Sequence, residues 1–209
     1  MYRHRADDSK EDTMKKTKTQ HQRIVDLVML ALLTALTAVL GALGSAIPIG
    51  ATTINLALVP VIIGAALYGY LGGAWLGGVS GVIILVSGQA APFMLLHVAG
   101  TIITVMVKGI LSGLCAGLAY KALKKINKYL AIFACAAVCP IVNTGIFLFG
   151  CLTFFKDSIF AGADASGMSV FGFLIVFYVG FNFLFELLTN LVLAPAVHRI
   201  ITIWYKEKH

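Results

Sequence analysis

The sequence predicts an all-α integral membrane protein with six transmembrane helices and with both termini in the cytoplasm. Of its 209 residues, 59% are hydrophobic and only 12% are charged, whereas a soluble domain has about 25% charged residues. From Leu27 to Val107 there is no Asp, Glu, Lys or Arg, and a stretch of this length suits several membrane crossings of about 20 apolar residues each. The 21 glycines agree with this class, because Gly is more frequent in membrane helices than in soluble ones. A soluble enzyme, a secreted disulfide-rich domain and a DNA-binding domain are excluded.

Six apolar segments follow one another along the chain. Residues 1–23 are hydrophilic, and we expect them to form a disordered cytoplasmic tail in which Met1 or Met14 is the natural start. The membrane domain is expected to cover residues 24–200, and residues 201–209 are expected to form a second cytoplasmic tail. The predicted spans are residues 27–47, 54–70, 74–87, 96–120, 129–153 and 169–198.

The positive charges predict the orientation of these spans. Seven of the 16 Lys and Arg residues lie in the first 23 residues, four lie between Lys121 and Lys128, and three lie close to the C-terminus. With six spans, the three clusters fall on one side of the membrane, which the positive-inside rule makes the cytoplasm. Because the clusters flank apolar segments, we interpret them as orientation signals and expect no nucleic-acid partner. The outer side then carries the loops 48–53, 88–95 and 154–168.

Small residues recur at four-residue spacing in three of the predicted helices. Such stripes allow helix backbones to approach closely in a lipid environment. Packing within the molecule is therefore their simplest interpretation. The three stripes are Ala31 and Ala35; Gly73, Gly77 and Gly81; and Gly109, Gly113 and Gly117.

Two charged residues lie within the apolar segments, where a charge is costly and often functional. Lys108 and Glu186 each precede a basic residue of the inner face by 13 residues, which places both about 20 Å above that face. Asn143 is expected near the same depth. Asn182, Glu186 and Asn190 follow one another at four-residue spacing and therefore share one face of the sixth helix. Three helices thus bring an amine, an acid and amides into one layer.

Two main interpretations of this layer stay open. A buried salt bridge between Lys108 and Glu186 could lock the helices together, or the layer could form the floor of a polar pocket open to the outside, and both can hold. A proton relay is a third possibility. Gln89 and His97 lie near the outer loop between the third and fourth spans. Both are candidates for the pocket, although a lone interfacial histidine is more often structural.

The residues that could support catalysis or metal binding are poorly placed for either. Cys135 and Cys139 are one helical turn apart, but no His or acid accompanies them, so packing is favoured and no metal is expected. Residues 78–81 read G-x-S-G, which resembles the serine motif of rhomboid proteases. Ser80 is expected near the inner face and His97 near the outer face, too far apart for a nucleophile and its base. We expect that the protein is no enzyme and needs no cofactor.

Four stretches of the second to sixth spans form a family pattern when they are taken together. They are residues 58–69 before the turn at Gly72 and Gly73, residues 108–121, residues 142–145, and Glu186 followed by residues 193–196. In this order they resemble the substrate-binding S component of energy-coupling factor (ECF) vitamin transporters. The resemblance covers about residues 25–200 and is closest to the branch of pantothenate, riboflavin and folate carriers.

The resemblance implies a function and partners. Such a protein lies in the bacterial cell membrane and binds a vitamin or vitamin precursor from outside, with pantothenate the first candidate and riboflavin or folate the next. It works with a transmembrane coupling subunit and two ATP-binding subunits. An autonomous secondary transporter or channel for a small solute is the alternative. Such transporters often carry internal repeats, and no convincing repeat is present here.

The resemblance also implies roles for particular residues. The pocket of the family is made by spans four to six and the outer loops, which agrees with the layer that holds Lys108 and Glu186. The loop 51–55, which ends at Asn55, would be a lid over this pocket. Ala31 and Ala35 match the small-residue motif that docks on the coupling subunit.

Overall fold

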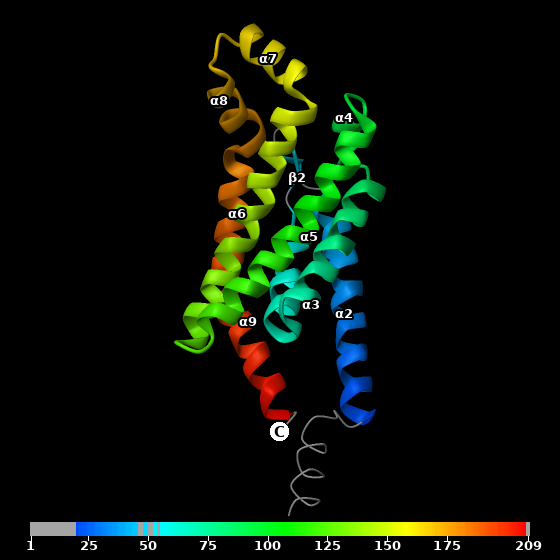
Figure 1. Ribbon diagram of the computed structural model, residues 1–209, viewed down its shortest axis with the longest axis vertical. Helices are drawn as coiled ribbons and strands as arrows, with labels where there is room; N and C mark the ends of the chain where they lie inside the picture. Colours follow the sequence, from blue (N-terminus) through cyan, green and yellow to red (C-terminus); the bar gives the residue numbers. More distant parts are fainter. Residues whose placement is uncertain (1–19, 46–47, 50–51, 54, 208–209) are drawn as a thin grey trace, which may run out of the picture.

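The structure, a computed structural model, describes residues 20–45, 48–49, 52–53 and 55–207 of the chain. Nearly all of the described residues are helical, and the helices form an elongated bundle (Figure 1). The elements in chain order are α2 (Gln20–Ser45), β1 (Pro48–Ile49), β2 (Thr52–Thr53), α3 (Leu58–Val86), α4 (Ala91–Met94), α5 (Val98–Leu123), α6 (Lys128–Phe154), α7 (Lys156–Ala165), α8 (Val170–Phe173), the π-helix η1 (Leu174–Val179) and α9 (Gly180–Glu207). Met1, Met14 and the predicted tail up to residue 19 lie outside the described residues.

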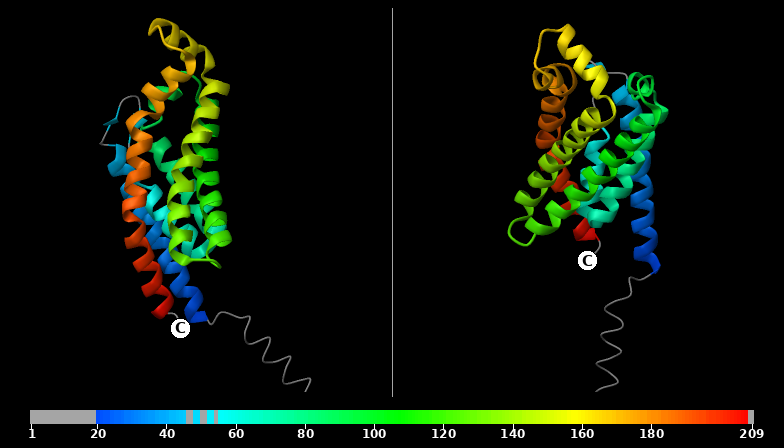
Figure 2. Two further views of the ribbon diagram at one scale, coloured as in Figure 1. Left: turned by 90° about the vertical axis from the view of Figure 1, so that its left-hand side faces the viewer. Right: turned by 45° about the horizontal axis from the view of Figure 1, so that its top comes forward.

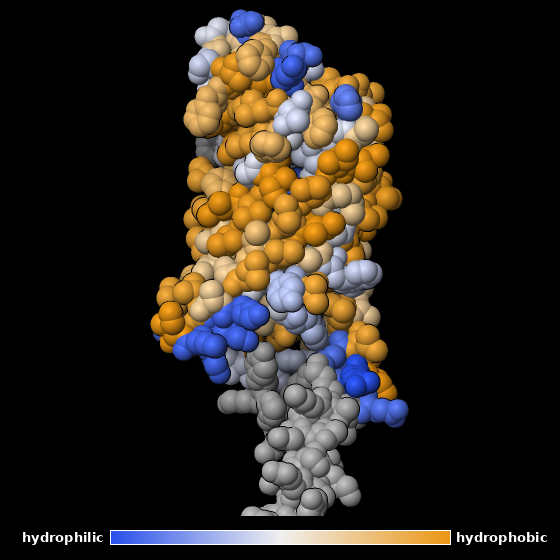
Figure 3. Space-filling view, in the orientation of Figure 1, coloured by the Kyte–Doolittle hydropathy of each residue, from blue (hydrophilic) through white to orange (hydrophobic). Residues whose placement is uncertain are grey.

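The helices have the length and composition of membrane-spanning segments. By length and composition, five of the described helices can cross a membrane, and the bent pair Lys156–Ala165 and Val170–Val179 passes the same test when it is taken together. The visible face of the molecule is apolar along its middle, and hydrophilic residues gather towards its two ends (Figure 3). The prediction of an all-α integral membrane protein is therefore confirmed.

Helix α3 consists of two arms that meet at Gly69. This residue has φ 72° and ψ −162°, a backbone conformation that is strongly unfavourable for any residue with a Cβ atom. The arms fold back on each other. This follows from the contact of Gly64 with Leu76, since a Cβ atom on Gly64 would collide with the Leu76 side chain. In a straight helix the two residues would lie about 18 Å apart. The predicted second and third spans correspond to these two arms, and the predicted turn near residue 72 lies at Gly69.

The chain ends and turns gather at two opposite ends of the molecule. The start of α2, the end of α9 and the connection between α5 and α6 lie at one end, whereas α4 and α7 lie at the other (Figures 1 and 2). Lys121 and Lys128 flank the connection between α5 and α6, so we call this the cytoplasmic end and the opposite one the outer end. The arrangement agrees with the orientation that the charges predict.

Three of the predicted spans agree closely with the helices α2, α5 and α6. The largest differences concern the outer end and the chain termini. The predicted outer loop 154–168 contains the helix α7, which buries Ile159 and Ala163 one turn apart. The predicted span 169–198 is divided into α8, η1 and α9, because the backbone at Gly180 turns out of the helical region with φ 23° and ψ −138°. Residues 20–23 and 201–207 of the predicted tails continue α2 and α9.

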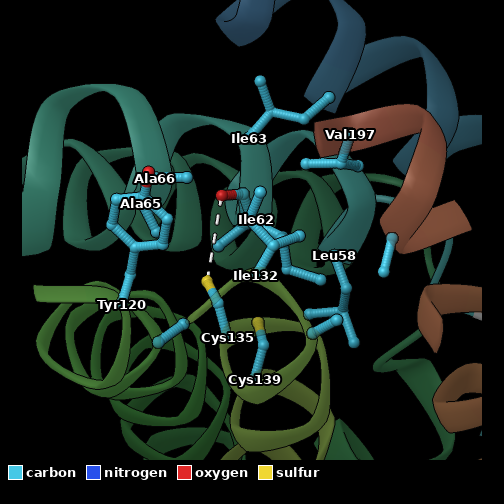
Figure 4. Close-up of a cluster of buried hydrophobic side chains, with 14 of the residues drawn as sticks. Leu58, Ile62, Ile63, Ala65, Ala66, Tyr120, Ile132, Cys135, Cys139 and Val197 are labelled. Atoms are coloured by element: carbon cyan, nitrogen blue, oxygen red, sulfur yellow. Dashed lines mark hydrogen bonds between the residues drawn. The ribbon is translucent and has the colours of Figure 1, made fainter. Parts of the chain in front are cut away.

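The first arm of α3 forms the centre of the main core. Its side chains pack against α5, α6 and α9 (Figure 4). Leu58, Val61 and Ile62 are at most 2% exposed, and the Sγ atom of Cys135 lies 3.9 Å from the carbonyl oxygen of Ile62. Because this arm is enclosed by other helices, its sequence is apolar on every side and carries no lipid-facing stripe.

The second arm of α3 packs directly on α5 through glycines. A Cβ atom on Gly77 would collide with the carbonyl group of Gly109, and one on Gly73 would collide with that of Gly113. The two backbones therefore touch, as small-residue stripes permit in membrane helices. This contact fixes α5, and with it Lys108, against α3.

Candidate functional site

A cavity of about 60 Å³ lies in the outer half of the molecule. Its wall is built by residues of β2, the segment before α3, the outer end of α3, α4, α5, α6, η1 and α9. It therefore lies between the outer connections and the membrane helices, on the side opposite the lysine-rich turn between α5 and α6.

The cavity brings together six of the seven predicted pocket residues. Lys108 comes from α5, Asn143 from α6, and Asn182 and Glu186 from α9, and all four line the cavity. The structure thus places the predicted polar layer of three helices around one space. Two further residues, Gln89 between α3 and α4 and Asn55 before α3, also line it. Ala51 and Ile54 of the predicted lid lie outside the described residues.

Polar atoms without hydrogen-bond partners are concentrated around this cavity. Among the described residues, five buried side-chain atoms lack a partner: Asn55 Oδ1, Thr104 Oγ1, Asn143 Oδ1, Asn182 Oδ1 and the Tyr68 hydroxyl. The first four belong to residues that line the cavity. Because about 90% or more of buried polar groups in proteins are hydrogen-bonded, each exception needs a physical reason. A cavity that collects four of them is suited to a ligand that supplies hydrogen-bond donors.

Lys108 contributes a positive charge that its protein surroundings leave available. Its ammonium nitrogen lies 5.1 Å from the centroid of the Phe147 ring, within the range of a cation–π contact. In the described part of the chain, no hydrogen bond or ion pair within 4.0 Å joins Lys108 to Glu186. The structure therefore lacks the direct contact that the salt-bridge interpretation requires. An ammonium group has three N–H donors, which here suit an anionic ligand group.

Glu186 instead bonds to the backbone of Asn55 and to the side chain of Asn182. The Asn55 backbone N–H donates to Glu186 Oε1 at 2.9 Å, and this bond joins the segment before α3 to α9. Glu186 is only 4% exposed, so such bonds replace the hydrogen bonds to water that its carboxylate loses on burial.

Gln89 forms a second polar connection near the outer end. Its Nε2 donates to the carbonyl oxygen of Gly41 at 2.8 Å and to Ser87 Oγ at 3.1 Å. Its Oε1 accepts from Thr53 Oγ1 at 2.7 Å. Gln89 therefore ties together the end of α2, β2 and the turn after α3, while it also lines the cavity.

His97 does not reach the cavity. It is the N-cap residue of α5, and its Nδ1 accepts from the backbone N–H of Gly100 at 2.9 Å. Its ring lies 5.8 Å from that of Phe154. The structural role that a lone interfacial histidine commonly has is thus the one observed, and we do not include His97 in the proposed site.

The aromatic wall of the cavity was not predicted from the sequence. Phe93, Phe147, Phe155 and Tyr178 all line it. The Phe93 ring lies 5.3 to 5.8 Å from the rings of the other three, in the range of favourable aromatic pairs. Usable signals existed for Phe147, which follows Asn143 by four residues, and for Tyr178, which precedes Asn182 by four residues, because residues at this spacing share a helix face.

Two threonines of α5 were also missed. Thr101 and Thr104 line the cavity and precede Lys108 by seven and four residues. Helical spacing places all three on one face, so the position of Lys108 could have identified them.

The residues of the rejected enzyme and metal hypotheses lie elsewhere. Ser80 is 2% exposed, packs inside the molecule and does not line the cavity. Cys135 and Cys139 are buried free thiols. In the ranges that the structure describes, no group of three or more His, Cys, Asp or Glu residues is placed to hold a metal ion.

The predicted docking residues lie on the surface of α2. Ala31 and Ala35 are exposed, whereas Leu33 and Thr37 of the same helix are buried in the molecule. The small-residue pair therefore faces away from the bundle and is open to another membrane helix.

Comparison with known families identifies the class of the protein. The fold is that of an integral membrane protein with a polar cavity in its outer half, and the model of the family "ECF transporter, substrate-specific component" matches residues 25–198. The chain therefore belongs to the substrate-specific components of ECF transporters, a family of transporter subunits and not of enzymes. No match was found among curated proteins or among solved structures.

Proposed function

We propose that this subunit binds a vitamin or vitamin precursor from outside the cell, with pantothenate the first candidate and riboflavin or folate the next. It would deliver this ligand together with a transmembrane coupling subunit and two ATP-binding subunits. The observation that carries the proposal is the cavity in the outer half, where Lys108 faces no acidic partner within 4.0 Å and four buried polar atoms lack hydrogen bonds.

The chemistry of the cavity favours a carboxylate ligand with hydroxyl or amide groups. Lys108 suits a carboxylate, since charge-assisted hydrogen bonds are about twice as strong as neutral ones. The oxygens of Asn55, Asn143 and Asn182 suit hydroxyl or N–H donors. Pantothenate carries a carboxylate, two hydroxyls and an amide N–H, and so offers both kinds of group.

The size of the cavity has a consequence for binding. Sites for small organic ligands commonly measure about 300–1,000 Å³, whereas this cavity measures about 60 Å³. A vitamin-sized ligand must therefore displace part of the lining when it binds. We expect the displaced part to be near the outer end, where short elements and connections form the wall.

The proposal is tested by calorimetric titration of the purified protein with pantothenate, riboflavin and folate. Lys108→Met keeps most of the side-chain volume and removes the charge. We expect it to weaken binding of the carboxylate ligand by about 10- to 100-fold, because a hydrogen bond to a charged group is worth about 1.5–3 kcal/mol. Lys156→Met is the matched control, since Lys156 lies at the start of α7, is exposed and does not line the cavity.

Two outcomes would contradict the proposal. If Lys108→Met and Lys156→Met bind the ligand equally well, the cavity is not the binding site. If liposomes that contain this chain alone take up the ligand without ATP, the protein is an autonomous transporter. Co-purification with a co-expressed coupling subunit and its ATPases would support the proposed assembly.

A further inference from the structure

We propose that Glu186 is a positioning residue, whose carboxylate holds the backbone of Asn55 so that the Asn55 side chain, and not Glu186 itself, contacts the ligand. This inference rests on the proposed function, because it assigns roles within the same cavity. It differs from the simplest interpretation of an acidic residue in a binding pocket, which is a direct bond to the ligand.

The hydrogen bond between Glu186 and Asn55 is the basis of the inference. Glu186 lies in α9 and Asn55 lies immediately before the first turn of α3, so no local structure brings them together. The bond from the Asn55 N–H to Glu186 Oε1 measures 2.9 Å, and both residues are at least nine-tenths buried. A buried bond between a backbone N–H and a carboxylate is of the strong, charge-assisted kind.

The backbone of Asn55 is bonded on both of its sides. Its N–H is held by Glu186, and its carbonyl oxygen lies 3.4 Å from the backbone nitrogen of Leu58, which opens α3. The two bonds leave only the side chain of Asn55 free. Its Oδ1 is buried without a partner, and the residue lines the cavity.

The division of roles follows from these bonds. One oxygen of Glu186 is committed to the backbone, whereas the Asn55 amide has an oxygen that nothing in the described structure satisfies. The ligand donor therefore meets Asn55 Oδ1, and Glu186 determines where that oxygen lies. Lys108 remains the group that receives the anionic part of the ligand.

The first experiment needs no ligand. Hydrogen–deuterium exchange of the Asn55 amide is measured in the intact purified protein for wild type, Glu186→Ala, Glu186→Gln and Lys156→Met. Glu186→Ala should raise the exchange rate by about tenfold or more, because the amide loses its acceptor. Glu186→Gln keeps a carbonyl acceptor and should retain most of the protection, and Lys156→Met, which changes an exposed residue outside the cavity, should leave it unchanged.

The second experiment is a double-mutant cycle with pantothenate as the probe. Glu186→Ala and Asn55→Ala are each expected to weaken binding by about tenfold. Because Glu186 acts mainly through Asn55 and also bonds to Asn182, the double variant should lose much less affinity than the sum of the two single losses. Unlike Glu186→Ala, the variant Glu186→Gln should bind pantothenate with an affinity within about threefold of wild type.

Three results would overturn the inference. One is unchanged exchange of the Asn55 amide in Glu186→Ala. Another is additive loss of affinity in the double variant, which would show that Glu186 contacts the ligand independently. The third is a loss of affinity in Glu186→Gln while the Asn55 amide stays protected. If wild type binds no pantothenate, the proposed substrate is wrong, and the exchange measurement still decides whether Glu186 positions Asn55.

Discussion

Asn143 shows how a single residue can be unfavourable for folding and favourable for binding. It is 5% exposed, lies in the middle of α6, and its Oδ1 has no hydrogen-bond partner. An unsatisfied buried polar group costs about 1–3 kcal/mol of stability. A ligand that donates a hydrogen bond to this oxygen supplies the bond that the folded protein lacks, so we expect Asn143 to have opposite effects on folding and on affinity.

Replacing Asn143 with Leu tests this opposition. We expect Asn143→Leu to raise the midpoint of thermal unfolding of the purified protein by a few degrees, because the unsatisfied amide is removed at similar volume. The same change should weaken pantothenate binding about tenfold. Asn190→Leu is the control, since Asn190 is a buried amide of α9 that does not line the cavity. A variant Asn143→Leu that loses stability while it keeps full affinity would show a purely structural amide.

At the residue scale, the sequence predicted the charged and amide groups of the cavity but not its apolar wall. Lys108, Asn143 and Glu186 are rare within apolar helices, and their distances from the cytoplasmic lysines and arginine set their depth. Phe93 and Phe155 could not be selected in this way, because both lie in predicted outer loops, where no helical spacing relates them to the polar candidates. His97 was a candidate from its depth alone, and its role as a helix cap depends on backbone geometry.

At the scale of elements, the contact between α3 and α5 depends on residues without side chains. Gly77 and its neighbour Gly78 provide a matched pair. A Cβ atom on Gly77 would collide with the Gly109 carbonyl, whereas one on Gly78 would lie 3.4 Å from a flexible atom of Ile110. The two positions lie on the same helix, but only Gly78 has room for an added methyl group.

We expect Gly77→Ala to destabilise the protein by about 1–3 kcal/mol, the usual cost of overpacking, and Gly78→Ala to have no such effect. The measurement is the thermal unfolding of both variants in the same detergent. Gly78→Ala should be neutral or slightly stabilising, because Ala favours helix more than Gly does. Equal destabilisation of the two variants would contradict the backbone contact between α3 and α5.

The separation of helices α5 and α6 was predictable, because the lysine-rich turn between Lys121 and Lys128 divides two long apolar segments. The break at Gly180 was not predicted, and the turn predicted at residues 72–73 lies at Gly69. Gly69 and Gly180 adopt positive φ values, but the chain has 21 glycines, and most of them are placed for close packing. A sequence shows where the backbone is free to bend, whereas the surrounding helices decide where it does.

At the scale of the whole molecule, one helix face is distinguished by its small side chains. Ala31 and Ala35 of α2 are exposed, and the surrounding exposed residues are larger, including Leu32 and Leu36. Small side chains at such positions allow a second helix to approach closely. The fold thus separates a surface suited to docking from the cavity, which lies among α3, α5, α6 and α9.

Enlarging one of these alanines should therefore impair assembly and spare binding. We expect Ala35→Leu to reduce co-purification with a co-expressed ECF coupling subunit by about tenfold, while pantothenate affinity stays at the wild-type value. Ala196→Leu is the control, because Ala196 is an exposed alanine on α9. Reduced co-purification for both variants, or for neither, would mean that the face of α2 has no special part in assembly.

The backbone contact between α3 and α5 also limits how the cavity can adapt to its cargo. Two helices that touch through glycine carbonyls have no side chains between them that could rearrange. We therefore expect the side of the cavity formed by α3 and α5 to keep its shape when a ligand binds. The opposite side consists of the short π-helix η1, the break at Gly180 and the bond between Glu186 and Asn55. We expect the fixed side to determine which molecules are recognised and the opposite side to determine how quickly they enter and leave.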